Sequence, residues 1–177
     1  LGPALFSIGI HDLLLQAVER YNVRVLGYLD DLSLFGAIDD ILRAFSFLEE
    51  ELGLRGLQVN RRKSFVLAKS RAYEERVISH GLSLETSGLK LLGGPVGTDE
   101  FVRAMVAKSF DSMTAPLIKL QSVSPQISLL LLQQCINSRP QFLLRVVPPL
   151  IAAEAAASFD GRIQSALSHI CNGEIDA

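Results

Sequence analysis

Hydrophobic and polar positions along the chain follow two different periods, and each change of period marks a predicted element. In residues 3–21 apolar side chains recur every three or four positions, which predicts an amphipathic helix with Pro3 in its first turn. Residues 23–36, VRVLGYLDDLSLFG, are two short apolar runs around an Asp-Asp pair, which predicts a β-hairpin with the two aspartates at its tip. Residues 39–52 return to the helical period, with Asp39 as the expected N-cap.

The first half of the chain mixes strand and helix patterns, and the character changes at Thr98. Residues 57–60 and 64–68 are short strand-like pieces, and GLKLLGGPVG at 88–97 predicts a strand, a Gly-Gly-Pro turn and a second strand. From the capping residue Thr98 onward the pattern is helical and is punctuated by prolines. The predicted fold class is α+β, with an antiparallel sheet and helices in residues 1–97 and an all-helical lobe in residues 98–177.

Composition narrows the class of protein only slightly. The chain has 177 residues, of which 49% are hydrophobic and 20% are charged, so it can bury a sizeable core. Its net charge of −2 gives no overall attraction to nucleic acid or to anionic membranes. No signal peptide and no membrane span are found, so we expect an intracellular protein of the cytoplasm or nucleus with no membrane partner. Cys135 and Cys171 are expected to be small core side chains in a reducing compartment.

The adjacent carboxylates Asp30 and Asp31 are the strongest candidates for chemistry. Two neighbouring like charges repel each other, and a two-residue hairpin loop normally uses Asn-Gly or a similar pair with positive φ. A bound cation would justify them, because Mg²⁺ prefers oxygen ligands and often uses one or two carboxylates plus substrate phosphates. Successive strand side chains point to opposite faces, so a two-metal site would need at least one more carboxylate from a neighbouring strand. A solvated turn is the alternative interpretation.

Several short motifs occur in the chain in the same order as in a known protein family. VLGYLDDLSLFG matches the aromatic-x-Asp-Asp hairpin of reverse transcriptases, and GLQVNRRKSFVL matches the Gly-Leu-x-x-Asn-x-x-Lys motif that follows it, with Asn60 and Lys63 in place. The opening LGP at 1–3 matches the end of the family's Gln-Gly-Asp-Pro-Leu-Gly-Pro motif. GLKLLGGPVG resembles the primer-grip turn, and residues 138–149 resemble a helical segment downstream of the palm. The chain thus resembles, over nearly its whole length, the C-terminal part of a reverse transcriptase of the non-LTR retrotransposon type.

The resemblance implies an enzyme, an RNA-directed DNA polymerase that works by two-metal nucleotidyl transfer. Its substrates would be an RNA template, a DNA primer and dNTPs. Residues 1–97 would be a partial palm and residues 98–177 a thumb-like region. Asp30 would be the principal Mg²⁺ ligand and Asp31 its less direct partner. Lys63 would approach the nucleotide phosphates and donate a proton to the leaving pyrophosphate, where a cation lowers the barrier; an ordinary surface lysine is the alternative.

Other residues would bind nucleotide or primer by the same resemblance. Tyr28 would lie near the primer end or the incoming nucleotide, unless it is simply a packed strand aromatic. The Gly-Gly-Pro segment would form the primer grip, although a tight turn needs no function. The full set implied for nucleotide and primer binding is Gly2, Pro3, Tyr28, Asn60, Gly93, Gly94 and Pro95.

Basic residues cluster just after the candidate hairpin. Between Arg55 and Arg71 there are six basic residues and no acidic one. A surface that faces phosphates has this composition, because Lys and Arg contacts to the backbone drive sequence-independent binding. An ordinary solvated loop has it too, and the sequence leaves both interpretations open.

The family also requires a catalytic aspartate and template-holding fingers that would lie upstream of Leu1. No other carboxylate in the chain sits in an apolar strand context. We therefore expect the two-metal Mg²⁺ site to be completed by an upstream aspartate, and this fragment alone to be inactive and poorly soluble.

Three alternatives remain open. The first is a group II intron-type or other cellular reverse transcriptase. The second is a catalytically dead nucleic-acid-binding or structural remnant of a retroelement. The third is an unrelated α+β domain whose hairpin binds a stray cation or nothing. Template preference, insertion-site specificity, flanking domains and oligomeric state are not encoded in any motif of the chain.

Overall fold

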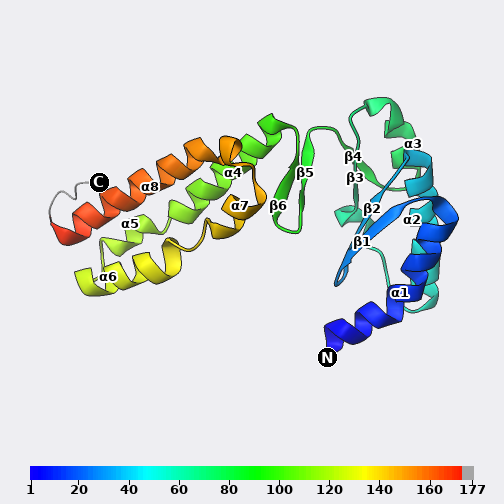
Figure 1. Ribbon diagram of the computed structural model, residues 1–177, viewed down its shortest axis with the longest axis horizontal. Helices are drawn as coiled ribbons and strands as arrows, with labels where there is room; N and C mark the ends of the chain where they lie inside the picture. The colour runs from blue at the N-terminus through cyan, green and yellow to red at the C-terminus, as the bar shows by residue number, and fades with distance from the viewer. Residues whose placement is uncertain (173–177) are drawn as a thin grey trace. The chain divides into compact units, whose positions relative to one another are not determined.

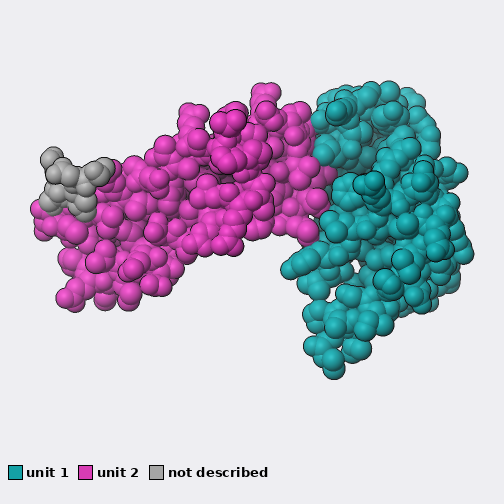
Figure 2. Space-filling view, in the orientation of Figure 1, with its two compact units in different colours: residues 1–86 teal, residues 87–177 magenta. Residues whose placement is uncertain are grey.

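A computed structural model describes residues 1–172 of the chain, which has the predicted α+β class with a helical C-terminal part. The chain forms two compact units, residues 1–86 and residues 87–177 (Figure 2). The hairpin at 88–97 belongs to the second unit, because it packs with the helix that follows it. A Cβ at Gly88 would overlap the Phe101 ring, and the Thr98 backbone N–H donates to the Ser87 carbonyl at 2.7 Å.

The first unit begins with a helix, a hairpin and a second helix, as the hydrophobic periods predict (Figure 1). α1 ends where Asn22 adopts a left-handed conformation with φ of 50°, a common way to stop a helix. The strands of the hairpin are antiparallel. The elements are α1 (Gly2–Tyr21), β1 (Arg24–Tyr28), β2 (Asp31–Phe35) and α2 (Ile38–Leu54).

The main core of the first unit lies between α1 and α2. Leu13 is completely buried, and the buried side chains around it come from both helices. Leu32 and Leu34 of β2 pack against this cluster, so one face of the hairpin is held on the helix pair. The buried members of the cluster are Ile10, Leu13, Ala17, Leu48 and Leu52.

The rest of the first unit contains a parallel strand pair, which differs from the antiparallel sheet expected. β3 (Phe65–Leu67) pairs with β4 (Ser83–Glu85) in parallel. The reason is the crossover between them: η2 (Arg71–Tyr73) and α3 (Glu74–Ser79) carry the chain back before β4 begins, so both strands run the same way. The short η1 (Arg61–Lys63) precedes β3. This region packs on a small cluster of Leu42, Val66, Val77 and Leu82.

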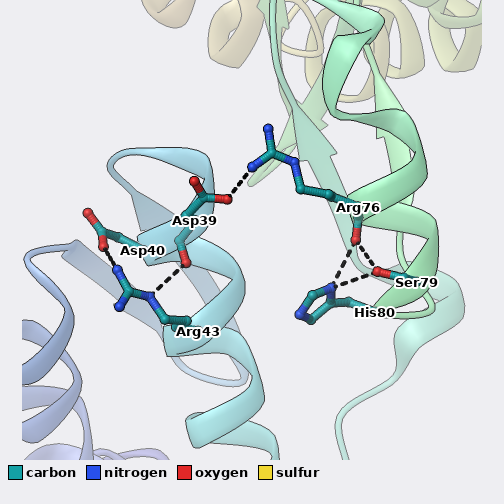
Figure 3. A network of polar contacts seen from close by, with 6 residues as sticks. All are labelled: Asp39, Asp40, Arg43, Arg76, Ser79 and His80. Atoms are coloured by element: carbon teal, nitrogen blue, oxygen red, sulfur yellow. Dashed lines mark hydrogen bonds and ion pairs between the residues drawn. The ribbon is translucent and has the colours of Figure 1, made fainter.

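An ion pair ties α3 to the first turn of α2 (Figure 3). Arg76 donates to Asp39 Oδ1 at 2.6 Å, and Arg43 donates to Asp40 Oδ1 at the same distance. The expected N-cap at Asp39 is therefore wrong: Ala37 is the N-cap, and Asp39 lies inside the helix. An acidic side chain in the first turn still stabilises the helix through its dipole, while its carboxylate is used by Arg76.

The second unit is a hairpin followed by helices (Figure 1). The predicted cap is confirmed, since Thr98 Oγ1 accepts from the Phe101 backbone N–H at 3.3 Å. Pro116 follows the end of the first long helix, as proline should. The elements are β5 (Gly88–Leu91), β6 (Gly94–Gly97), α4 (Asp99–Thr114), α5 (Leu117–Leu120), α6 (Pro125–Leu131), η3 (Leu132–Ile136), α7 (Gln141–Val146) and α8 (Pro149–Cys171).

The core of the second unit is centred on α4 and α8, which run in the same direction. Arg103 reaches the Leu150 carbonyl near the start of both helices, and Asp111 pairs with Arg162 further along both. The intervening helices α5, α6 and α7 bring the chain back so that α8 can start beside the start of α4 (Figure 1). Phe110 of α4 meets Phe159 of α8 edge to face, with ring centroids 5.7 Å apart.

Both cysteines are exposed, which corrects the expectation of core side chains. Cys135 lies in the π-helical turn η3, whose buried positions are Leu132 and Ile136. Cys171 is the last residue of α8. Separately, no helix within residues 1–172 combines the length and the apolar character needed to cross a bilayer.

The α1–α2 core generates the first prediction. Leu13→Ala should lower the free energy of unfolding by about 2–5 kcal/mol, because Leu13 is 0% exposed and its loss would leave a cavity. Leu15→Ala on the same helix is the matched control, since Leu15 is 47% exposed, and should change stability by less than about 0.5 kcal/mol. Urea unfolding of the full chain followed by circular dichroism measures both. Equal effects of the two substitutions would contradict the assignment of Leu13 to the core.

Candidate active site

The acidic hairpin is closed by a two-residue loop, Leu29-Asp30. Tyr28, the last residue of β1, pairs with Asp31, the first residue of β2. The predicted tip at Asp-Asp is therefore displaced by one residue: Asp30 lies in the loop and Asp31 lies on the strand. Leu29 has φ of 56°, and a positive φ at the first loop position alone is typical of a type II′ turn.

Leu29 is a feature that sequence reasoning missed. A positive φ costs an ordinary L-residue roughly 1–2 kcal/mol, and glycine is the usual residue at this position of the turn. The lack of an Asn-Gly or Gly-containing pair in the loop was the available signal. The strained position lies between Tyr28 and Asp30, so the conformation of Leu29 sets the direction in which the loop carboxylate leaves the hairpin.

The hairpin has an inner and an outer face. Leu32 and Leu34 face the α1–α2 core, and Gly27 lies opposite Leu32 in the strand register. A Cβ at Gly27 would lie 3.3 Å from Leu32 Cδ2, a tight contact, and 3.5 Å from Leu14 Cδ1, an ordinary one. Because strand side chains alternate, Tyr28 and Asp31 belong to the other face.

Tyr28 and both carboxylates are accessible to solvent. Tyr28 is 61% exposed, so it is not a packed strand aromatic. The side chains of Asp30 and Asp31 are exposed, and neither has a hydrogen-bond or ion-pair partner among residues 1–172. In the same range there is no group of three His, Cys, Asp or Glu side chains placed to hold a metal ion. The hairpin thus offers two carboxylate ligands, and the described residues add no third beside them.

Asn60 and Lys63 lie together at the short helix η1. Asn60 precedes the helix, and its carbonyl accepts from the Lys63 backbone N–H and from Ser64 Oγ, both at 3.0 Å. The Lys63 side chain is exposed and has no hydrogen-bond or ion-pair partner in the described part of the chain, so its ammonium is available to an anion. Exposure fits a phosphate contact and an ordinary surface lysine equally well.

Arg61, the first residue of η1, stabilises the fold by linking η1 to α2. Its guanidinium makes a bidentate pair with Glu49 of α2, with both N···O distances at 2.6 Å. It also lies against Gly81, where a Cβ would come within 2.9 Å of Arg61 Nη1. The hydrogen bond from Arg61 holds the pKa of the Glu49 carboxyl below its usual value, partial burial opposes this shift, and the charge of Arg61 adds to it.

The basic run is therefore less available than its sequence indicates. Arg61 is neutralised by Glu49, and Arg55 donates to the Gly9 carbonyl at 3.4 Å. The basic side chains of the run that are exposed and have neither a hydrogen-bond nor an ion-pair partner among residues 1–172 are Arg62, Lys63, Lys69 and Arg71.

The other predicted nucleotide- and primer-binding residues lie in two places. Gly2 and Pro3 form the exposed first turn of α1, and a Cβ at Gly2 would meet nothing within 4 Å. Gly93, Gly94 and Pro95 belong to the second unit.

The expected Gly-Gly-Pro turn is displaced toward the N-terminus. The loop residues are Leu92 and Gly93, with φ of 48° and 90°, which is typical of a type I′ turn. Gly94 and Pro95 lie in β6, where Pro95 is opposite Lys90. A Cβ at Gly93 would lie 3.2 Å from the Phe142 ring, so this loop packs on α7.

Comparison of the chain with models of protein families, with curated proteins and with solved structures finds no match. The fold and site define an α+β chain whose exposed hairpin carries two adjacent carboxylates at a strained turn. A functional assignment for it rests on these residues and their geometry.

The strained turn generates the second prediction. Leu29→Gly should leave the free energy of unfolding unchanged or raise it by up to about 1 kcal/mol, because glycine relieves the positive φ but adds backbone entropy to the unfolded chain. Ser33→Gly in β2 is the matched control and should lower stability by about 0.5–1 kcal/mol, since Ser33 lies within a strand. Urea unfolding measures both. Equal losses in the two variants would show that Leu29 is not strained.

The Arg61–Glu49 pair generates the third prediction, which concerns pH. Because the pKa of Glu49 in the folded chain lies below its ordinary value of 4.5, the pair contributes stability above pH 4.5. That contribution is lost as the pH falls through the folded-state pKa. Glu49→Gln should therefore lower stability at pH 7 and make the decline below pH 4.5 shallower. Unfolding midpoints measured from pH 7 to pH 3 test this, with Glu50→Gln as the neighbouring control; parallel curves for wild type and Glu49→Gln would refute it.

Proposed function

We propose that the chain is part of a reverse transcriptase domain and that the β1–β2 hairpin supplies carboxylates for RNA-directed DNA synthesis by two-metal nucleotidyl transfer. The observation that carries this proposal is the hairpin tip, where Asp30 and Asp31 are exposed, adjacent and unpartnered among residues 1–172. Two repelling carboxylates with no partner suit a hard divalent cation, which binds them through oxygen. Mg²⁺ is the ion that phosphoryl-transfer chemistry most often uses in this way.

Each hairpin residue has a distinct role in this proposal. Asp30 in the loop is the principal metal ligand, and Asp31, at the start of β2, is the second. Tyr28 lies opposite Asp31 in the strand register, and its exposed ring would lie near the primer end or the incoming nucleotide. Lys63 neutralises the nucleotide phosphates as charge develops on the leaving pyrophosphate. The third carboxylate is contributed by a strand outside these 177 residues, as in the family that the chain resembles.

The proposed domain roles follow the same resemblance. Residues 1–97 serve as palm and residues 98–177 as thumb. The palm assignment is supported by a hairpin that rests on two helices with its acidic end free, since a polymerase palm must present metal ligands to a bound duplex. We also propose that the domain derives from a non-LTR retrotransposon.

A catalytically dead nucleic-acid-binding remnant is the second candidate. Two observations favour it. No third acidic ligand lies near the hairpin within residues 1–172, and four exposed basic side chains of the run from Arg55 to Arg71 have no hydrogen-bond or ion-pair partner in that range. Phosphate contacts by such side chains give binding without chemistry. The two candidates differ in whether Mg²⁺ at the hairpin matters for duplex binding.

Duplex binding by the 177-residue chain is the fourth prediction. With a labelled RNA–DNA primer–template, fluorescence anisotropy should show tighter binding in Mg²⁺ than in EDTA at equal ionic strength, because the ion bridges the carboxylates and the nucleic acid. Asp30→Asn should abolish this difference, and the control Asp12→Asn, an exposed carboxylate on α1, should retain it. Lys63→Ala should lower the slope of log affinity against log salt by about 1.

The outcomes separate the alternatives. Mg²⁺-independent binding that is unchanged by Asp30→Asn would replace the polymerase proposal with the remnant, and absence of binding would favour an unrelated α+β domain. Primer extension with dNTPs should be undetectable for the chain alone. Extension that Asp30→Ala abolishes would mean that these 177 residues already hold a complete metal site.

A further inference from the structure

The outer face of the β1–β2 hairpin is a small surface that nothing in the described chain covers. It carries the side chains that alternate with those facing the core, and we call it the outer hairpin face. Half of its side chains are apolar or aromatic and exposed: Leu26 at the centre is 49% exposed, and Tyr28 and Phe35 at the two ends are 61% and 47% exposed. Its residues, in register pairs, are Arg24 with Phe35, Leu26 with Ser33, and Tyr28 with Asp31.

The strands of this hairpin also lack further partners. β1 and β2 form a two-stranded sheet, and neither pairs with another strand within residues 1–172. Packing of Leu32 and Leu34 on α1 and α2 stabilises this two-stranded sheet, but it leaves the outer face and the strand edges free. Exposed edges and exposed apolar faces are the surfaces through which β-structures associate.

The charges on this face lie at opposite ends. Arg24 is at the end near α1 and Asp31 is at the loop end, and neither has an ion-pair partner in the described part of the chain. Four residues of strand separate their positions, a distance of about 13 Å at 3.3–3.4 Å per residue. They cannot pair within one chain, but an antiparallel copy of the same face would place each opposite the other.

We propose that the outer hairpin face binds a second copy of this chain, packed face to face about a two-fold axis that crosses the strands. In this arrangement Arg24 meets the end formed by the partner's Tyr28 and the partner's Asp31. By symmetry the second copy repeats both contacts, because an isologous interface pairs i with j and j with i. The two Leu26 side chains meet at the centre.

The charge pattern selects this arrangement over its alternative. A two-fold axis along the strands would set the two Arg24 side chains at one end and the two Asp31 side chains at the other. Like charges brought together disfavour that packing. The antiparallel arrangement instead converts both repulsions into attractions and stacks a guanidinium on an aromatic ring.

The size of the face sets the expected strength. Six side chains on each copy are far fewer than the roughly 20–30 residues per side of a standard interface. We therefore expect a weak dimer, with a dissociation constant of about 10⁻⁶ M or higher. The inference does not depend on the proposed function, because neither metal nor nucleic acid takes part in it.

Sedimentation equilibrium of the full chain over roughly 1 µM to 1 mM tests the dimer. Wild type should shift from monomer to dimer across this range. Arg24→Asp and Asp31→Arg should each weaken association by about tenfold or more, because each replaces two attractions with two repulsions. The double variant Arg24→Asp/Asp31→Arg should restore it, and Leu26→Asp should abolish it.

A matched control is Arg62→Asp, an exposed charge reversal in the same unit, which should leave association unchanged. Circular dichroism of each variant verifies the fold. A monomer at every concentration would overturn the proposal. So would a dimer whose dissociation constant is the same in wild type, Arg24→Asp and Asp31→Arg. Failure of the double variant to recover association would also overturn it, because only an antiparallel contact between copies predicts that rescue.

Discussion

The packing of one face of the β1–β2 hairpin against α1 and α2 determines what the other face can do. Leu32 and Leu34 pack against the buried side chains of α1 and α2. Because strand side chains alternate, a shift of the register by one residue would bury Asp31 and expose the leucines. Burying an unpaired carboxylate is costly, so the hydrophobic effect and electrostatics fix the same register. The exposed position of Asp31 is thus a consequence of the core.

Local patterns predicted much of the fold, and tertiary contacts explain the differences. The helix from Gly2 to Tyr21 and the Thr98 cap follow from rules that act within one or two turns. The two-residue loop falls at Leu92 and Gly93 rather than at the expected Gly-Gly-Pro, and it packs beside the Phe142 ring, a contact across some fifty positions of sequence. The parallel pairing of β3 with β4 likewise depends on a crossover that no single segment specifies.

In the candidate site, too, the sequence identifies the residue types, and tertiary contacts determine their exposure and pairing. The acidic pair and Lys63 are visible as residue types in the sequence, but their exposure and pairing are not. Arg61 is one of three adjacent basic residues in the sequence, yet the fold uses it to hold Glu49 of α2. Tyr28 had two open interpretations, and the register that places it opposite Asp31 on the outer face excludes the packed one. Sequence finds the candidates, and the packing decides which remain available.

The hairpin carboxylates differ from several other acidic side chains of the protein because they have no arginine partner in the described part of the chain and can bind a ligand. Asp39, Glu49 and Asp111 each pair with an arginine from a distant segment, so their charges stabilise contacts between elements. Asp30 and Asp31 make no such contact within residues 1–172, and their mutual repulsion is uncompensated there. Either a cation or an arginine from a second copy would compensate it. Both occupants need Asp31, so by mass action a ligand that binds the free hairpin draws the chain away from self-association.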